Sequence, residues 1–171
     1  LPHGRMISEL QDAGVKFGEK TLVDIIANVC DAMAYATQRG HHYRMPGPRD
    51  ISIDVEHHAS IVNVFRPSTG KPRDHVADTK KFLMMLRSLA DGARARHLID
   101  DLAREGHKWD GLCTRAAELQ EQFRERSLLK RADTKEAQDI QAARESDKMP
   151  VWMYVVSAVV VLALIVGIVI R

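Results

Sequence analysis

Apolar side chains recur at every third or fourth position in three stretches of the chain, which is the spacing of one buried face of an α-helix. The first stretch predicts a helix over residues 19–39 that ends at Gly40. The second predicts a helix over residues 76–91, which Gly92 interrupts before the apolar stripe resumes and ends at Gly106. These stripes must face a common core, so the chain is expected to be mainly α-helical.

The third stretch predicts a long helix. Asp110 is a suitable N-cap for it, because an aspartate oxygen can accept a hydrogen bond from a free N–H of the first turn. Its apolar stripe fades after Leu129. A weaker pattern around Met6–Ala13 predicts a short helical turn near the beginning of the sequence.

The apolar period changes from 3.6 to 2 in the middle of the chain. Ile51, Ile53 and Val55 alternate with polar residues, which is typical of a strand with one buried face. A second β-rich stretch, Ser60–Phe65, follows after a short connection, and segments containing proline and glycine flank the pair. The pattern predicts a β-hairpin over about residues 51–65, which must pack on the helices or on a partner because an isolated hairpin is marginally stable.

The end of the sequence follows neither period. The 20 residues of Val151–Ile170 carry no charge, and as a helix they would span about 30 Å, the thickness of a bilayer's hydrocarbon core. Pro150 suits the first turn of such a helix, and Trp152 and Tyr154 lie where aromatic rings prefer the membrane interface. A buried soluble helix would have a polar face, which this segment lacks. We therefore expect a single transmembrane helix over residues 150–171.

Small residues within the predicted span and charged residues beside it predict how the span packs and which way it is oriented in the membrane. Ala163 and Gly167 are four positions apart, the spacing that lets two transmembrane helices approach closely. Five Lys or Arg residues lie between positions 130 and 149, and only Arg171 follows the span. By the positive-inside rule, the N-terminal domain is expected on the cytosolic, matrix or stromal side. The sequence begins with Leu1 rather than Met, which indicates either a removed leader or a truncation.

The segment before the predicted span is strongly charged and mixed in sign. Residues 130–149 contain five Lys or Arg and five Asp or Glu. A helix supported by neighbours such as Lys135 and Asp139 is favoured over a disordered tether, because most of these residues are good helix formers. The predicted divisions are a soluble helical domain (1–129), a charged helical linker (130–149) and a membrane anchor (150–171).

Composition narrows the classes of partner and chemistry. Charged residues make up 28% of the chain but the net charge is only +2, whereas a nucleic-acid-binding protein normally shows a clear basic excess. We therefore expect no nucleic-acid partner. Cys30 and Cys113 are too few for a disulfide framework and both have apolar neighbours. Two buried thiols are favoured, with a single disulfide between them as the alternative.

Two histidine pairs, His41–His42 and His57–His58, lie before and after the first predicted strand of the hairpin. Imidazole is a common metal ligand, but adjacent residues of a strand point to opposite faces, so each pair offers only one ligand easily. A metal site needs three or four convergent ligands. The histidines are therefore expected to face solvent or a partner. The sequence shows no catalytic motif and predicts neither a metal site nor a cofactor.

These features favour a non-catalytic accessory subunit of a large membrane complex, such as a respiratory-chain or ATP synthase assembly of the mitochondrial inner membrane. Its expected partners are other subunits and membrane lipids. A long helix ahead of a C-terminal anchor also resembles the architecture of membrane-fusion SNARE proteins, which makes a tether in membrane traffic the alternative. SNARE helices keep their apolar layers up to the membrane, whereas Lys130, Asp133, Arg144 and Asp147 occupy those positions here. A membrane-held enzyme is the third hypothesis.

Overall fold

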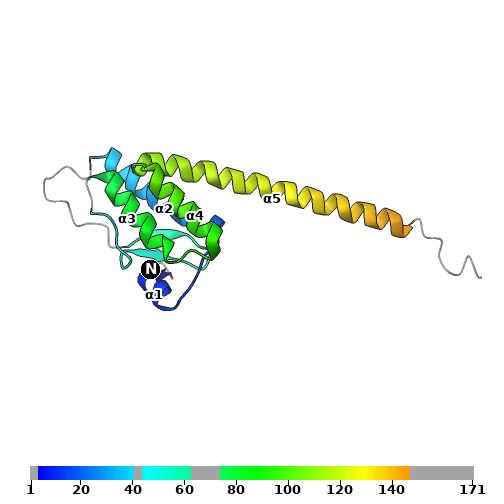
Figure 1. Cartoon of the computed structure of the whole chain (residues 1–171), viewed down its shortest axis with the longest axis horizontal. Helices are drawn as coiled ribbons and strands as arrows, with labels where there is room; N and C mark the ends of the chain where they lie inside the picture. The colour runs from blue at the N-terminus through cyan, green and yellow to red at the C-terminus, as the bar shows by residue number, and fades with distance from the viewer. Residues whose placement is uncertain (1–3, 41–43, 63–73, 147–171) are drawn as a thin grey trace, which may run out of the picture. The chain divides into compact units, whose positions relative to one another are not determined.

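A computed structural model describes residues 4–40, 44–62 and 74–146. The protein is mainly α-helical with one small antiparallel sheet (Figure 1). The chain divides into two compact units, Leu1–Arg124 and Glu125–Arg171. In order along the chain, the elements are β1 (Arg5–Met6), α1 (Ile7–Asp12), α2 (Glu19–Gln38), β2 (Ile51–Ile53), β3 (Ala59–Ile61), α3 (His75–Arg87), α4 (Gly92–Glu105) and α5 (Trp109–Ser146).

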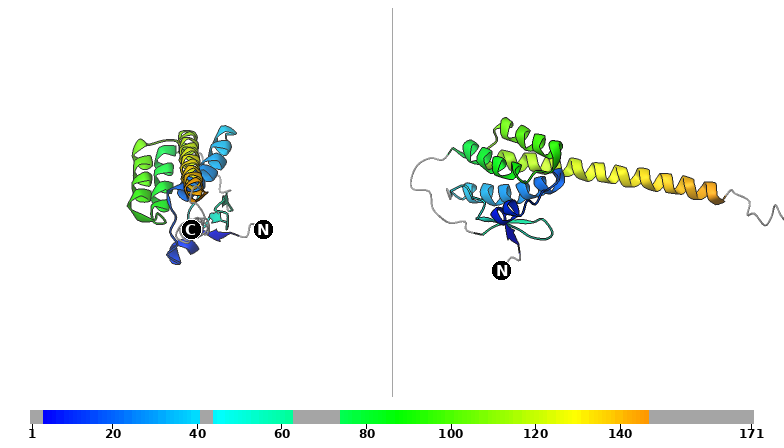
Figure 2. Two further views of the ribbon diagram at one scale, coloured as in Figure 1. Left: turned by 90° about the vertical axis from the view of Figure 1, so that its right-hand side faces the viewer. Right: turned by 60° about the horizontal axis from the view of Figure 1, so that its bottom comes forward.

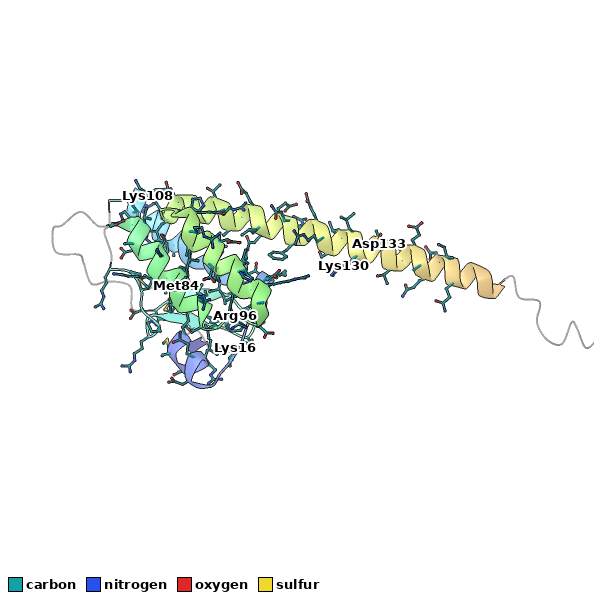
Figure 3. The ribbon with its side chains drawn as sticks, viewed as in Figure 1. Lys16, Met84, Arg96, Lys108, Lys130 and Asp133 are labelled. Atoms are coloured by element: carbon teal, nitrogen blue, oxygen red, sulfur yellow. The ribbon has the colours of Figure 1, made fainter. Side chains whose placement is uncertain are left out.

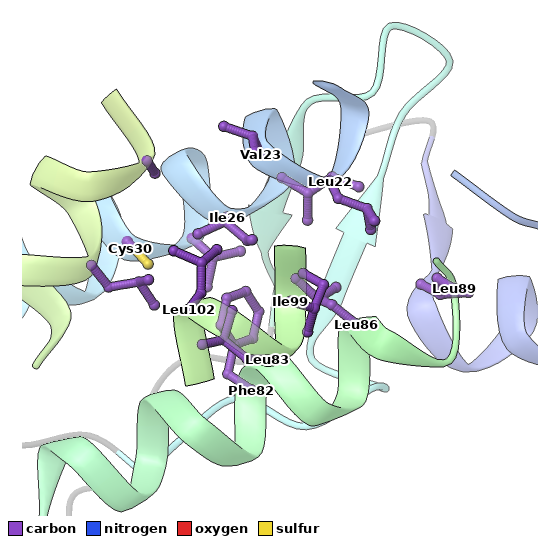
Figure 4. Close-up of a cluster of buried hydrophobic side chains, with 14 of the residues drawn as sticks. Leu22, Val23, Ile26, Cys30, Phe82, Leu83, Leu86, Leu89, Ile99 and Leu102 are labelled. Atoms are coloured by element: carbon purple, nitrogen blue, oxygen red, sulfur yellow. The ribbon is translucent and has the colours of Figure 1, made fainter. Parts of the chain in front are cut away.

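In the first unit, α2 lies between the α3–α4 helix pair and the sheet (Figure 2). Helices α3 and α4 pack against each other, and α2 contacts both α4 and β3. The helices meet in one apolar core, whose centre is shown in Figure 4. Fully buried side chains of this core include Leu22, Ile25, Ile26, Phe82, Leu86, Ile99 and Leu112.

The predicted helices are confirmed, with corrected ends. Helix α2 begins at Glu19 and ends at Gln38, before Gly40 with φ 75°. The predicted helix over residues 76–91 stops at Arg87, because Phe17 pairs with Ala90 in a bridge that takes the following residues out of the helix. The Phe17 N–H donates to the Leu89 carbonyl at 2.7 Å, and the Asp91 N–H donates to the Phe17 carbonyl at 2.8 Å.

The long third helix also starts differently from the prediction. Helix α5 begins at Trp109, so Asp110 lies inside the first turn and is not the N-cap. Trp109 is itself a core residue, 2% exposed. Helix α5 continues through the charged segment as far as Ser146, which confirms the helical alternative for residues 130–146. The expected ion pair between Lys135 and Asp139 does not form within the described part of the chain.

The predicted hairpin is present, and a third strand extends it. Its first strand ends at Ile53 and not at Val55, and residues 63–65 of the second predicted strand lie outside the described residues. In β2 and β3, Ile51 pairs with Ile61 and Ile53 with Ala59. Strand β1 pairs with the other edge of β2 and was not predicted, because two residues are too few to show a period. The expected alternation fails: Ser52 is 3% exposed, and Val55, beyond the end of the strand, is 90% exposed.

Gly4 explains how a serine comes to be buried in the central strand. A Cβ atom added at Gly4 would lie 2.3 Å from the Ser52 hydroxyl oxygen and 2.9 Å from the Ile53 backbone. The chain at Gly4 therefore covers the face of β2 that the period-2 pattern predicted to be exposed. Both faces of β2 are covered, so alternation alone could not predict its burial.

Asp74 is the N-cap of α3, with its carboxylate accepting from the Val76 N–H at 3.0 Å and the Ala77 N–H at 3.1 Å. We predict that Asp74→Ala lowers the free energy of unfolding by about 1 kcal/mol, because two N–H groups lose their acceptor. Asp74→Asn, which keeps an acceptor oxygen, should lose clearly less. Urea unfolding followed by circular dichroism measures both, and equal losses would contradict the capping role.

Among the described residues, no helix has both the length and the apolar character needed to cross a bilayer. The predicted span over residues 150–171, with its residues Pro150, Trp152, Tyr154, Ala163 and Gly167, lies outside the described residues.

Candidate functional site

The turn that joins β2 and β3 holds one of the two predicted histidine pairs. Asp54 organises this turn, because its Oδ1 accepts from the Glu56 N–H at 2.9 Å and from the His58 N–H at 2.8 Å. The His58 Nδ1 atom lies 3.5 Å from the Asp54 carboxylate and 3.6 Å from the Glu56 carboxylate. His57 has φ 67°, a left-handed conformation uncommon for residues other than glycine. Both histidines are exposed.

An apolar groove lies beside this turn. Phe17 stands edge-on to the His57 ring, with 5.6 Å between ring centroids, and the exposed Val55 extends the same wall. The cavity holds about 200 Å³, which is less than most small-molecule sites require. The groove therefore suits a single side chain of a partner better than a cofactor. It is lined by Arg5, Leu10, Val15, Phe17, Ile53, Asp54, Val55 and His57.

The charge of Asp54 stabilises the turn. Its backbone hydrogen bond from His58, aided by that from Glu56 and by the nearby His58 imidazole, lowers the pKa of the Asp54 carboxyl. A lowered folded-state pKa means that this stabilisation is present above the pKa of the unfolded chain and is lost as pH falls through the folded pKa. We predict that acidification loosens the turn in that window.

Amide resonances of Glu56 and His58, followed by NMR during an acid titration, would report this loosening. In Asp54→Ala the two amides should already show the low-pH state near neutral pH. In Asp12→Ala, which removes an exposed carboxylate at the end of α1, they should titrate as in the natural sequence. Amides that stay unchanged in Asp54→Ala would contradict the role assigned to this carboxylate.

A second groove lies within the first unit, between α4 and the beginning of α5. Its apolar lining comes from Leu98, Leu102 and Leu119. The charged side chains of its lining pair with one another or with the neighbouring Glu118, and this pairing leaves little net field to attract a charged cofactor. The ion pairs are Asp101–Arg104 at 2.9 Å, Glu105–Arg115 at 3.5 Å and Glu118–Arg115 at 2.9 Å.

The two cysteines are free thiols in the structure, Cys30 buried and Cys113 half-buried. Burial raises the pKa of both thiols, so the nucleophilic thiolate is disfavoured at each. Asp31 raises the pKa of Cys113 further. Among the described residues, neither thiol has the electropositive surroundings typical of a reactive cysteine.

The described residues contain no group of three His, Cys, Asp or Glu side chains placed to hold a metal ion. His41 and His42 lie outside the described residues, so their predicted exposure to solvent or to a partner stays a prediction. Sequence reasoning found the histidines of the turn but missed Arg5 and Phe17, which reach the groove through the unpredicted strand and the segment after α1. No protein-family model and no curated protein sequence matches the chain.

Proposed function

We propose that the chain is a non-catalytic accessory subunit of a large membrane complex, held in the bilayer by one span over residues 150–171. The observation that carries the proposal is the uncharged 20-residue run Val151–Ile170, which begins shortly after the end of α5. A segment of that length without a polar face is stable in lipid and unstable in water. The complex we favour is a respiratory-chain or ATP synthase assembly of the mitochondrial inner membrane.

In this proposal the function is scaffolding. The span docks on neighbouring transmembrane helices through Ala163 and Gly167, while Trp152 and Tyr154 fix its depth at the interface. The first unit lies on the matrix side and holds peripheral subunits. The small apolar groove beside His57 and Phe17 supports this role, because it is sized for a partner's side chain.

Gentle extraction of the native membrane followed by native electrophoresis tests the proposal. The chain should migrate with core subunits of one energy-converting complex and should resist alkaline extraction. Protease added to intact organelles from which the outer membrane has been removed should leave the first unit uncut, because it lies in the matrix. Recovery of a free monomer would contradict the subunit role, and cleavage from outside would contradict the orientation.

A SNARE-like tether is the second candidate. The continuity of α5 from the folded first unit through Ser146 favours it, since a tether needs an unbroken helix toward its anchor. It predicts that the first unit faces the cytosol and binds its partner in trans, between two membranes. The absence of sustained apolar layers after Phe123 counts against it.

A further inference from the structure

The second unit exposes large apolar side chains on a helix that is otherwise charged. Every described side chain from Glu125 to Gln141 is exposed, and Figure 3 shows side chains projecting from α5 on all sides around Lys130 and Asp133. Leu128, Leu129 and Ile140 are nonetheless more than half exposed. A purely solvated helix gains nothing from these three residues.

The apolar residues of α5 change face along the helix. Successive residues advance by about 100° around the axis. Up to Phe123 the apolar positions share one side, and Leu112, Ala116 and Leu119 on that side are buried in the core. Leu128, Leu129, Ala132 and Ile140 fall instead within an arc of roughly 120° on the other side. They form a separate apolar surface and do not prolong the core stripe.

The charges of the second unit follow the same division. Between residues 125 and 141, the arc that holds the leucines carries three carboxylates and no Lys or Arg. The rest of the circumference carries all four Lys or Arg side chains of this stretch and a single carboxylate, that of Asp133. We call the first arc the acidic face; its members are Glu125, Leu128, Leu129, Ala132, Glu136, Asp139 and Ile140. The other positions include Arg126, Lys130, Arg131, Asp133 and Lys135.

The carboxylates of the acidic face are available to a partner. Glu125, Glu136 and Asp139 have no ion-pair partner among the described residues. Carboxylates that flank exposed leucines complement a surface on which Lys or Arg flanks apolar side chains. An anionic lipid surface would repel this face, and a second copy packed face to face would set carboxylate against carboxylate.

We propose that the acidic face of α5 docks a basic amphipathic helix of a partner protein. The helix lays its apolar side along Leu128, Leu129 and Ile140, and its Lys or Arg side chains meet Glu125, Glu136 and Asp139. This inference rests on the proposed function in one respect: the partner is taken to be a neighbouring subunit of the same complex. The recognition chemistry belongs to α5 itself.

The probe for the test is a synthetic amphipathic peptide of 18 residues, about five helical turns, made of Leu and Lys, with an otherwise identical peptide in which Glu replaces every Lys. The full chain is placed in nanodiscs of neutral lipid, empty nanodiscs serve as the blank, and fluorescence anisotropy measures binding. The Lys peptide should bind and the Glu peptide should not. Leu128→Gln/Leu129→Gln should weaken binding roughly 100-fold, because two apolar contacts are lost.

Charge variants separate the acidic face from the net charge of the chain. Glu125→Gln/Glu136→Gln should weaken binding of the Lys peptide roughly tenfold. Thr134→Lys/Gln138→Lys makes the same change in net charge on the other side of the helix. Because salt screens the new lysines from a peptide bound on the acidic face, this variant should change binding of the Lys peptide by no more than about twofold. Circular dichroism of each variant confirms that α5 remains helical.

Several results would overturn the proposal. One is equal binding of the two peptides, and another is equal loss in the two charge variants. Sedimentation of the chain as a dimer that Leu128→Gln/Leu129→Gln dissociates would assign the face to a second copy. Binding to anionic vesicles that the same variant abolishes would assign it to lipid. Failure of the membrane anchor is measured separately, by alkaline extraction. In that case the same peptides are titrated into the full chain in mild detergent, because the acidic face lies outside the proposed span.

Discussion

Replacing Trp109 with alanine is expected to lower the free energy of unfolding of the first unit by about 3–5 kcal/mol. Trp109 is the first residue of α5 and is 2% exposed. Its ring packs on Phe82, with 5.6 Å between centroids. Since a domain of this size is usually stable by only about 5–15 kcal/mol, the cavity would remove a large part of the stability. Urea unfolding of the full chain in mild detergent, followed by circular dichroism, measures the loss.

Two controls make the Trp109 prediction specific. The Trp109 Nε1 atom is buried without a hydrogen-bond partner among the described residues, so Trp109→Phe loses volume but no hydrogen bond and should cost clearly less than the alanine variant. Met84 is 40% exposed, and Met84→Ala should fall within about 0.5 kcal/mol of the natural sequence. An unchanged midpoint for Trp109→Ala would show that the α3–α5 contact contributes little.

Two arginines in the middle of the proposed span are expected to abolish membrane integration. Val160 and Leu162 lie near the midpoint of Val151–Ile170, where each arginine costs about 2.5–3.5 kcal/mol on insertion scales. Val160→Arg/Leu162→Arg should therefore move the chain from the alkali-resistant membrane fraction to the soluble fraction or to aggregates. Immunoblotting of the separated fractions measures this shift.

The matched control exchanges the two apolar residues without adding charge. Val160→Leu/Leu162→Val keeps the composition of the segment and should leave the chain in the membrane fraction. If alkali extracts the natural protein completely from the membrane, the proposed anchor is wrong. The proposed orientation and assembly partners are then wrong as well. Because peptide binding to the acidic face needs no insertion, that result would leave the inference on α5 to be tested alone.

Many helix boundaries could be predicted because they depend on local backbone chemistry. Gly40 and Gly106 follow helix ends with φ near 70°, a conformation that glycine adopts without steric cost, and both were predicted as stops. The helix over residues 130–146 could likewise be predicted from good helix formers in a stretch free of glycine and proline. The charge sorting of α5 is also present in the sequence, but it was visible only once the helix was known to be continuous.

Contacts between distant parts of the chain determined the end of α3 and the burial of Ser52, which the local sequence pattern did not predict. Helix α3 ends at Arg87 because the backbone of Phe17, about seventy positions earlier, bonds to residues 89 and 91. Ser52 is buried because Gly4 lies against it. Neither contact leaves a period in the sequence, since each joins segments too short to repeat.

The sequence by itself determined the helical class, the helix stops at Gly40 and Gly106, the hairpin and the uncharged segment at the end of the chain. Each of these follows from neighbours a few positions apart, whose spacing and chemistry bias the backbone directly. The tertiary structure alone decided the third strand, the groove formed by Phe17 and His57, and the burial of Trp109. These depend on which distant surfaces meet, and close packing of the whole domain settles that choice.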